Sequence, residues 1–259
     1  MARAAGALQP PLARVRVEGK NRRVFSPGGP TFMELMRQAL SSTDQGYDLL
    51  APKFELTPFR TPDVVLNAAV PVLGNDRSID RAIDLCCGTG AGVKLLRPLC
   101  REAVVGIDRS PGMLAEARTR LEGPGAPVAL LRGDVLDPPF RSGFDLATCF
   151  GAFGHILEED EPRFVAAVHA LLKPGGRFVF YTAPKPKLSN PGLWLAKGFN
   201  AVMRVRNALI HPPFVMYYLT FLLDRATTLL ESSGFEVSVH EHLPPPPFHG
   251  LVLVVATKK

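Results

Sequence analysis

The sequence has no apolar run long enough to cross a membrane. Its longest uncharged apolar stretch, residues 208–223, covers 16 residues and is interrupted by Pro212 and Pro213. A membrane-spanning helix needs about 20 apolar residues. Residues 1–17 lack acids and contain arginines, so a transit peptide is an alternative, but they have no apolar core of a secretory signal and little serine. We therefore expect a cytoplasmic protein without a targeting segment.

Cysteine is scarce and lacks the spacing of a metal-binding motif. The chain has four cysteines: Cys86, Cys87, Cys100 and Cys149. All four lie in apolar contexts, so we predict reduced thiols in the core of a protein from a reducing compartment. His240 and His242 would share a strand face, but no third ligand is evident, so we predict no metal site.

Positive charge is concentrated at one end of the chain. Residues 1–23 hold +5 of the formal net charge of +6, so the rest is close to neutral. This distribution argues against a nucleic-acid-binding surface spread over the domain. We expect residues 1–30 to form a basic, flexible arm, followed by one folded domain over residues 31–259.

Two helix-start signals lie before residue 80. Thr31 followed by Glu34 is a capping box. Thr61 followed by Pro62 predicts a second helix with Thr61 as its N-cap. We therefore expect a helical preface to the rest of the domain.

From residue 81 onward, short apolar runs alternate with helical patterns. The strand-like runs cover residues 81–86, 103–108, 127–131, 144–150 and 177–182. Continuous apolar strands separated by helices are typical of a parallel sheet covered on both faces, which predicts a doubly wound α/β fold. The last two runs, 234–243 and 250–259, have no helix between them and should pair antiparallel.

The stretch "IDLCCGTGAG" places Asp84 before a glycine turn that contains Gly88 and Gly90. Ligands of open α/β sheets bind beyond the carboxyl ends of the strands. A dinucleotide-binding turn would continue as Gly-x-Gly-x-x-Gly, but its third position is Val93, so the pattern is broken. Asp84 is placed to accept a hydrogen bond from a ligand ammonium.

Two further aspartates follow the next strands. Asp108 lies 20 residues beyond Gly88, the distance at which an acid accepts the hydroxyls of a ribose. Asp134 follows the third strand, where a carboxylate can accept an adenine amino group. Each signal is modest alone, and turn-forming or helix-capping roles are the alternatives, but their order and spacing together are specific.

The segments "IDLCCGTG", "VVGIDRSPGML", "RGDVLDPPF" and "ALLKPGGRFVF" resemble the class I S-adenosylmethionine-dependent methyltransferases. The resemblance covers about Tyr47 to the C-terminus and implies a Rossmann-like, seven-stranded sheet with a reversed last strand. It also implies S-adenosylmethionine as cofactor. The cofactor-binding residues it implies are Tyr47, Asp84, Cys86, Gly88, Gly90, Asp108, Arg109, Met113, Asp134, Val135 and Phe150. Cys86-Cys87 departs from the family, which often has small residues there.

His155, just past the fourth strand, is the candidate general base, because imidazole titrates near neutral pH. A pocket-lining or helix-starting histidine without a chemical role is the alternative. His211, Phe214 and Tyr218 are expected to join His155 in the acceptor pocket.

A helical insert is expected at about residues 188–223. Its apolar stripe comprises Leu195, Phe199, Val202, Val205 and Leu209. The opposite stripe comprises Lys197, Asn200, Arg204 and Asn207. We expect a lid whose apolar stripe packs on the cofactor domain. A purely structural cap and a peripheral helix on a membrane are the alternatives.

The sequence therefore predicts a methyltransferase for a small, rather apolar acceptor: a quinone precursor, a lipid-like compound or a specialised metabolite. A nicotinamide-dependent oxidoreductase and a non-catalytic S-adenosylmethionine-binding partner protein are the alternative functions. Nothing in the sequence fixes the methylated atom or the oligomeric state.

Overall fold

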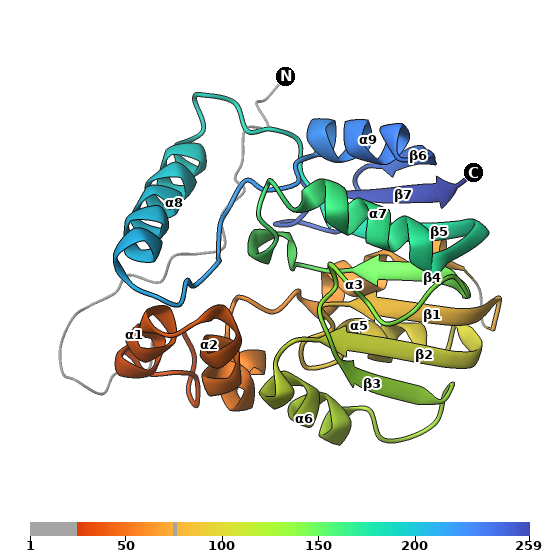
Figure 1. The fold of residues 1–259 in the computed structure, drawn as a ribbon, viewed down its shortest axis with the longest axis horizontal. Coiled ribbons are helices and arrows are strands. Elements are labelled where there is room, and N and C mark those ends of the chain that lie inside the picture. Colours follow the sequence, from red (N-terminus) through yellow and green to blue (C-terminus); the bar gives the residue numbers. More distant parts are fainter. Residues whose placement is uncertain (1–24, 75–76) are drawn as a thin grey trace.

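The computed structural model describes residues 25–74 and 77–259. Most of the predicted basic arm, residues 1–30, therefore lies outside the described residues. The described chain forms a central sheet with helices on both faces and further helices at one end of the sheet (Figure 1).

The sheet has seven strands in the order β3-β2-β1-β4-β5-β7-β6. The strands are β1 Ile79–Leu85, β2 Cys100–Asp108, β3 Val128–Arg132, β4 Phe144–Cys149, β5 Leu172–Thr182, β6 Phe235–His240 and β7 Val252–Lys258. β7 runs antiparallel to both of its neighbours, β5 and β6, and all the other pairs are parallel. The predicted doubly wound sheet with a reversed last strand is confirmed.

Side chains alternate between the two faces of the sheet along each strand, and they contribute to a hydrophobic core on each face. The covering helices are α3 Asp63–Ala68, α4 Val70–Leu73, α5 Ala91–Leu96, α6 Pro111–Arg120, α7 Glu161–Leu171 and α9 Leu223–Ser232. In β1, Ile83 and Leu85 face one core with α7 and α9, whereas Ala82 faces the other with α3 and α5. Burial on both faces explains why these strands are continuous apolar runs.

The N-terminal preface is helical, as predicted, but one cap differs. It comprises α1 Phe32–Leu40, α2 Thr43–Leu50 and the 3₁₀ helix Ala51–Leu56, before α3 and α4. Thr31 and Glu34 form the predicted capping box. The predicted cap at Thr61 is wrong, because Pro62 is the N-cap of α3 and the Thr61 hydroxyl instead donates to the Phe150 carbonyl, 3.4 Å away.

The insert begins with a 19-residue helix, α8 Pro191–Leu209, and continues without regular structure until α9 begins at Leu223. Its orientation contradicts the predicted packing of the apolar stripe. Leu195, Val202 and Val205 are all more than half exposed. The helix turns the other way because its polar stripe binds backbone. Asn200 and Asn207 bond residues 214–218.

Within the described ranges, no helix is both long and apolar enough to cross a membrane.

Candidate functional site

A cavity lies at the carboxyl ends of β1, β2 and β4, where α2 and the preface cover the sheet edge. The residues predicted from the sequence that line it are Tyr47, Asp84, Cys86, Gly88, Asp108, Arg109, Met113, Phe150 and His155. A second, adjoining cavity is lined by Asp134 and Val135, and it shares Cys86, Arg109 and His155 with the first. The fold thus gathers residues that follow the ends of four strands, β1 to β4, with residues of α2 and of the helix after β2, and two of them, Tyr47 and His155, are 108 positions apart in the sequence.

Four of the predicted residues line neither of these two cavities in the described chain. Gly90 is the N-cap of α5, in a left-handed conformation with φ of 89°. Phe214 is buried and its ring stacks on Tyr47, with centroids 6.3 Å apart. Tyr218 is 46% exposed and His211 is also exposed. The cofactor-binding role of Gly90 and the acceptor-pocket roles of His211, Phe214 and Tyr218 stay predictions.

The glycine turn holds two carboxylates close to the cavity. Asp84 is 3% exposed, and its Oδ1 accepts a 2.7 Å hydrogen bond from the Thr148 hydroxyl on the neighbouring β4. Burial raises the pKa of Asp84 to about 7, and the negative charge of Asp108 adds to the shift. A positively charged ligand group would therefore complement this carboxylate.

Asp108 organises the turn itself. Its Oδ2 accepts from the Gly88 N–H at 2.8 Å, and its Oδ1 accepts from the Ser110 N–H at 2.9 Å. Burial raises the pKa of Asp108, although both backbone donors oppose the shift. A Cβ at Gly88 would meet no atom within 4 Å, so the backbone here is open to the cavity. A ligand can approach this turn closely.

Gly92 is a site residue that sequence reasoning did not identify. A Cβ at this position would lie 2.4 Å from Oδ2 of Asp84. The absence of a side chain at Gly92 therefore makes room for the buried carboxylate. Its position in "GTGAG" could have suggested this role, since it is the first turn of the helix that follows the strand.

We expect Gly92→Ala to lower the free energy of unfolding by about 1–3 kcal/mol, the usual cost of overpacking a core. Gly198 in α8 is the matched control, because a Cβ there meets no atom within 4 Å. Gly198→Ala should raise stability by about 0.5–1 kcal/mol, since glycine disfavours helix interiors. Urea denaturation measures both variants. Equal stability of the Gly92→Ala variant and the parent would contradict the packing argument.

Cys86 directly follows β1 and has a left-handed conformation, with φ of 55°. This backbone is uncommon for a residue with a side chain. The side chain is partly exposed and borders both cavities, whereas the other three cysteines are buried. The prediction of core thiols therefore holds for Cys87, Cys100 and Cys149, whereas Cys86 is only partly buried: it packs against the core and also borders the cavities.

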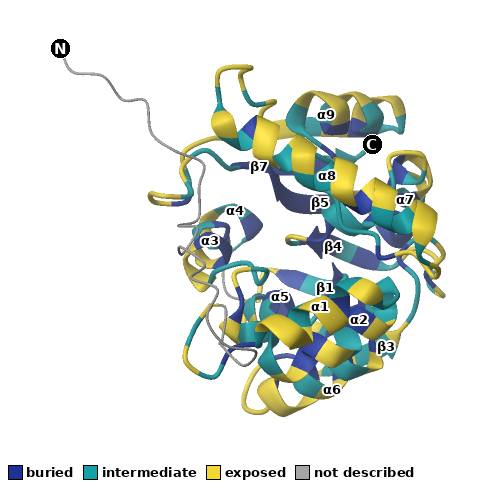
Figure 2. Cartoon of the chain, turned by 90° about the vertical axis from the view of Figure 1, so that its left-hand side faces the viewer, coloured by how far each residue is buried: buried dark blue, intermediate teal, exposed yellow. Residues whose placement is uncertain are grey.

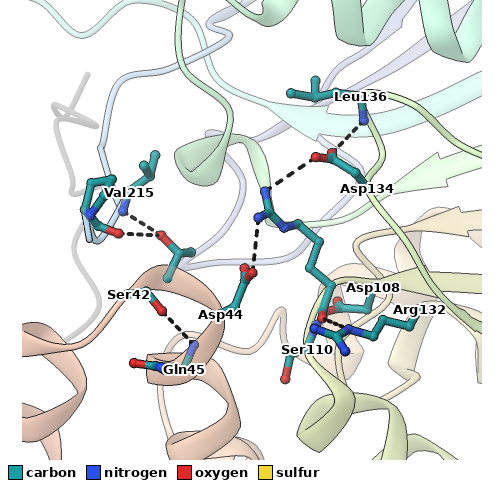
Figure 3. Close-up of polar contacts among 12 residues, drawn as sticks. Ser42, Asp44, Gln45, Asp108, Ser110, Arg132, Asp134, Leu136 and Val215 are labelled. Carbon is teal, nitrogen blue, oxygen red and sulfur yellow. Dashed lines mark hydrogen bonds and ion pairs between the residues drawn. The ribbon is translucent and has the colours of Figure 1, made fainter. Parts of the chain in front are cut away.

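Arg109 connects α2 to the loop after β3. Its guanidinium lies 3.1 Å from Asp44 and 3.5 Å from Asp134, and these two carboxylates point to it from opposite sides (Figure 3). Arg109 is 58% exposed, so the pairs are screened and mainly set the position of the side chain.

α2 is fixed over the site by Asp48. Its Oδ1 accepts hydrogen bonds from the Ser110 hydroxyl and from the Gly112 N–H at 2.9 Å, at the N-terminus of α6. A carboxylate at this end of a helix is favoured by the helix dipole. Sequence reasoning missed this contact because it joins residues 62 positions apart.

His155 and Tyr47 form a hydrogen-bonded pair at the side of the cavity. His155 Nδ1 is 2.7 Å from the Val215 carbonyl, which can only accept, so Nδ1 carries the hydrogen. In neutral His155, Nε2 then accepts from the Tyr47 hydroxyl, also 2.7 Å away. Burial lowers the pKa of His155 and raises the pKa of Tyr47, so both are neutral near pH 7.

Comparison with known proteins identifies the domain. Residues 82–176 match a family model described as a methyltransferase domain. This match covers the glycine turn, the aspartates and the strands that carry them. Residues 82–176 thus carry a methyltransferase domain, and the chain is similar to the class I S-adenosylmethionine-dependent methyltransferases.

Two relatives illustrate the similarity. The chain is 35% identical over 147 residues to a demethylmenaquinone methyltransferase of Thermus thermophilus, covering 56% of this chain and 66% of the relative. It is 34% identical over 122 residues to a 2-phytyl-1,4-naphthoquinone methyltransferase of Nostoc punctiforme, covering 45% of this chain and 51% of the relative. The chain thus spans about half to two thirds of the length of these curated relatives.

Solved structures share the fold. A magnesium protoporphyrin IX methyltransferase from Synechocystis, solved with bound SAH, covers 91% of both chains with a TM-score of 0.54 and 15% identity. The SAH complex of DhpI covers 87% of this chain and 98% of its own, with a TM-score of 0.60 and 19% identity. At these identities the likeness concerns the fold of the methyltransferase domain.

Proposed function

We propose that the chain transfers a methyl group from S-adenosylmethionine to a small, apolar acceptor of quinone type. The observation that carries this proposal is the buried carboxylate of Asp84 and the half-buried carboxylate of Asp108 beside the open backbone of Gly88. Residues 31–259 would act together in this reaction, because α2 of the preface contributes Tyr47 to the same cavity.

The residues fit the cofactor. Asp84 would bind its ammonium group, and Asp108 would accept its ribose hydroxyls. Asp134 and Val135 would border its adenine, with Met113 packed nearby. When bound, S-adenosylmethionine supplies a methyl group activated by a sulfonium. The protein then has to orient the acceptor, exclude water and accept a proton.

His155 and Tyr47 support the last of these tasks. A hydroxyl of the acceptor can lose its proton to Nε2 of His155, either directly or through the Tyr47 hydroxyl. In the second route, Tyr47 donates its own proton to His155 as it accepts one from the acceptor. The Val215 carbonyl holds the ring in the tautomer that both routes need.

The acceptor class is supported by two observations. The cavity carries several aromatic side chains, including Phe54, Phe59 and Phe150, which suit an apolar ring. The two relatives described above are methyltransferases named for demethylmenaquinone and for a phytyl-naphthoquinone.

The decisive experiment is methyl transfer with purified protein, methyl-labelled S-adenosylmethionine and reduced naphthoquinones of different tail lengths. The expected result is a labelled quinone product that depends on Asp108. Calorimetric binding of NAD without any response to S-adenosylmethionine would instead favour a nicotinamide-dependent oxidoreductase.

Binding of S-adenosylmethionine is expected to depend on pH through Asp84. The pKa of this carboxyl is about 7 in the free protein, so below pH 7 it is mostly protonated. A bound ammonium requires the carboxylate, so binding must release this proton. Affinity should therefore rise by up to about tenfold per pH unit between pH 5.5 and 7. It should fall above about pH 8, where an α-amino group loses its own proton.

Calorimetry in two buffers of different ionisation enthalpy measures the released proton directly. Asp84→Asn should bind more weakly and with a flat pH profile over the same range. The same slope in Asp84→Asn and in the parent would assign the titration to another group.

A further inference from the structure

α8 turns an apolar face to the solvent. The exposed large apolar residues of this helix and of the residue stretch just before it are Leu188, Trp194, Leu195, Val202, Val205 and Leu209. At 100° per residue, those within the helix occupy one continuous arc. The opposite arc is held by Asn200 and Asn207, which bond the backbone of residues 214–218. The helix is thus anchored through polar groups and leaves its apolar groups free.

α1 has the same inverted arrangement. Phe32, Met33, Met36 and Leu40 are exposed, whereas Gln38 is buried. Arg206 of α8 joins the two helices, because its guanidinium donates to the Ala39 carbonyl at 2.9 Å and to the Ser41 carbonyl at 2.7 Å. Figure 2 shows α8 and α1 on the same side of the molecule, with exposed residues on both. We name the exposed apolar residues of α8, α1 and Leu188 the outer apolar face.

The outer apolar face has a basic border. Lys197 and Arg204 lie along one edge of the exposed arc of α8, Lys185 and Lys187 precede the helix, and Arg37 lies on α1; all five are exposed. Residues 191–209 contain no aspartate or glutamate. An apolar face bordered by lysine and arginine, with a tryptophan on it, is typical of helices that lie in the plane of a membrane interface.

We propose that the outer apolar face docks on the surface of an anionic lipid bilayer. The apolar side chains would enter the boundary between headgroups and acyl chains, while the basic border contacts lipid phosphates. A second copy of the chain is a poorer occupant, since a self-complementary contact would bring two basic borders together and residues 191–209 contain no acid to pair with them. This inference is independent of the proposed function, because docking needs neither cofactor nor acceptor.

The docked helix is connected to the site. Asn207 of α8 bonds the backbone of Phe214, whose ring stacks on Tyr47. One residue later, the Val215 carbonyl holds His155. Docking therefore places the wall of the cavity next to the lipid, where an apolar acceptor with a long tail would reside.

The chain contains its own probe for this proposal. Trp194 is the only tryptophan in the sequence, it lies on the outer apolar face, and it is 58% exposed. Vesicles of phosphatidylcholine that contain about 30% phosphatidylglycerol carry a negative surface potential, which attracts basic segments. Binding to these vesicles should shift the emission of Trp194 to shorter wavelength. Brominated lipid should quench it. Pure phosphatidylcholine vesicles should give a weaker response.

Two pairs of variants separate the contributions, measured by co-sedimentation of the full chain. Lys197→Gln with Arg204→Gln should lower partitioning about 25-fold, since each basic residue near an anionic surface contributes about fivefold. The matched control is Lys94→Gln with Arg118→Gln, two exposed positions on α5 and α6. Val202→Ser with Val205→Ser should lower partitioning by about tenfold or more, and its control is Val64→Ser with Val239→Ser. Circular dichroism checks the fold of each variant.

Three outcomes would overturn the proposal. The first is no spectral shift and no co-sedimentation with anionic vesicles at low salt. The second is co-sedimentation that shifts no Trp194 emission and that is unchanged by the Val202 and Val205 substitutions. This outcome would assign lipid binding to the basic residues 1–23. The third is a shift of Trp194 emission that occurs without lipid, grows with protein concentration and is accompanied by a doubled mass in solution. This outcome would make the outer apolar face a contact between copies of the chain.

Discussion

Substitution of Asp108 by alanine is expected to weaken S-adenosylmethionine binding about 10–150-fold. A hydrogen bond to a charged group contributes about 1.5–3 kcal/mol, and each 1.4 kcal/mol is a factor of ten in affinity. Asp108 already accepts from the Gly88 and Ser110 N–H groups, so it is held in place before a ligand arrives. Its remaining acceptor capacity is available to the hydroxyls of a ribose.

The same two bonds complicate the alanine variant, because losing them loosens the glycine turn. Asp108→Asn keeps the shape and retains a carbonyl oxygen, so it should show an intermediate loss. Asp145→Asn is the matched control, since Asp145 lies at the opposite end of the sheet and accepts from Arg81 N–H and Lys173. It should leave cofactor affinity unchanged. Calorimetry gives the affinity of each variant, and thermal unfolding gives its stability. A variant that binds weakly because its glycine turn is loosened can thus be distinguished from one that has lost only the contact with the ribose.

The sequence predicted most of the sheet and the position of the cavity. Continuous apolar runs such as "FDLATC" and the aspartates at strand ends are local signals, and parallel strands bring their carboxyl ends to one edge. Asp84, Asp108 and His155 could therefore be placed near one another without knowing any contact. The reversed last strand followed from the absence of a helix between residues 240 and 252.

The orientation of α8 could not be predicted in this way. Amphipathic spacing assigns the apolar side to the interior, yet here Asn200 and Asn207 find partners on the backbone of the following segment. Those partners are carbonyls and N–H groups, which every residue has, so the sequence carries no sign of them. The same holds for the Val215 carbonyl, which fixes the tautomer of His155.

Substitution of His155 by glutamine is expected to lower turnover about 10²–10⁴-fold, the usual contribution of a general base. Glutamine can still bond Val215 and Tyr47 but cannot take a proton near neutral pH. Affinity for S-adenosylmethionine should change little, since the cofactor carboxylates are untouched. His249→Gln, at an exposed position away from the cavity, is the control and should retain full turnover.

The pH profile adds a readout that a merely structural histidine would not move. Burial lowers the pKa of His155 below its ordinary value of 6.5. The unprotonated base is therefore present at neutral pH, and activity should fall only as the pH drops below about 6.5 and the ring protonates. Above that value the parent should show a plateau with respect to this group. If His155→Gln kept near-parental turnover from pH 6 to 9, His155 would not be the general base and would only line the pocket.

Tyr47→Phe then separates the two routes for the proton. Phenylalanine keeps the ring against Phe214 and His155 and removes only the hydroxyl that bonds Nε2. If the proton passes through Tyr47, this variant should lose nearly as much turnover as His155→Gln, and the double variant should lose little more. If His155 takes the proton directly, Tyr47→Phe should keep most of its turnover, because Nε2 is then free for the acceptor hydroxyl. Single-turnover rates with saturating acceptor distinguish the two results.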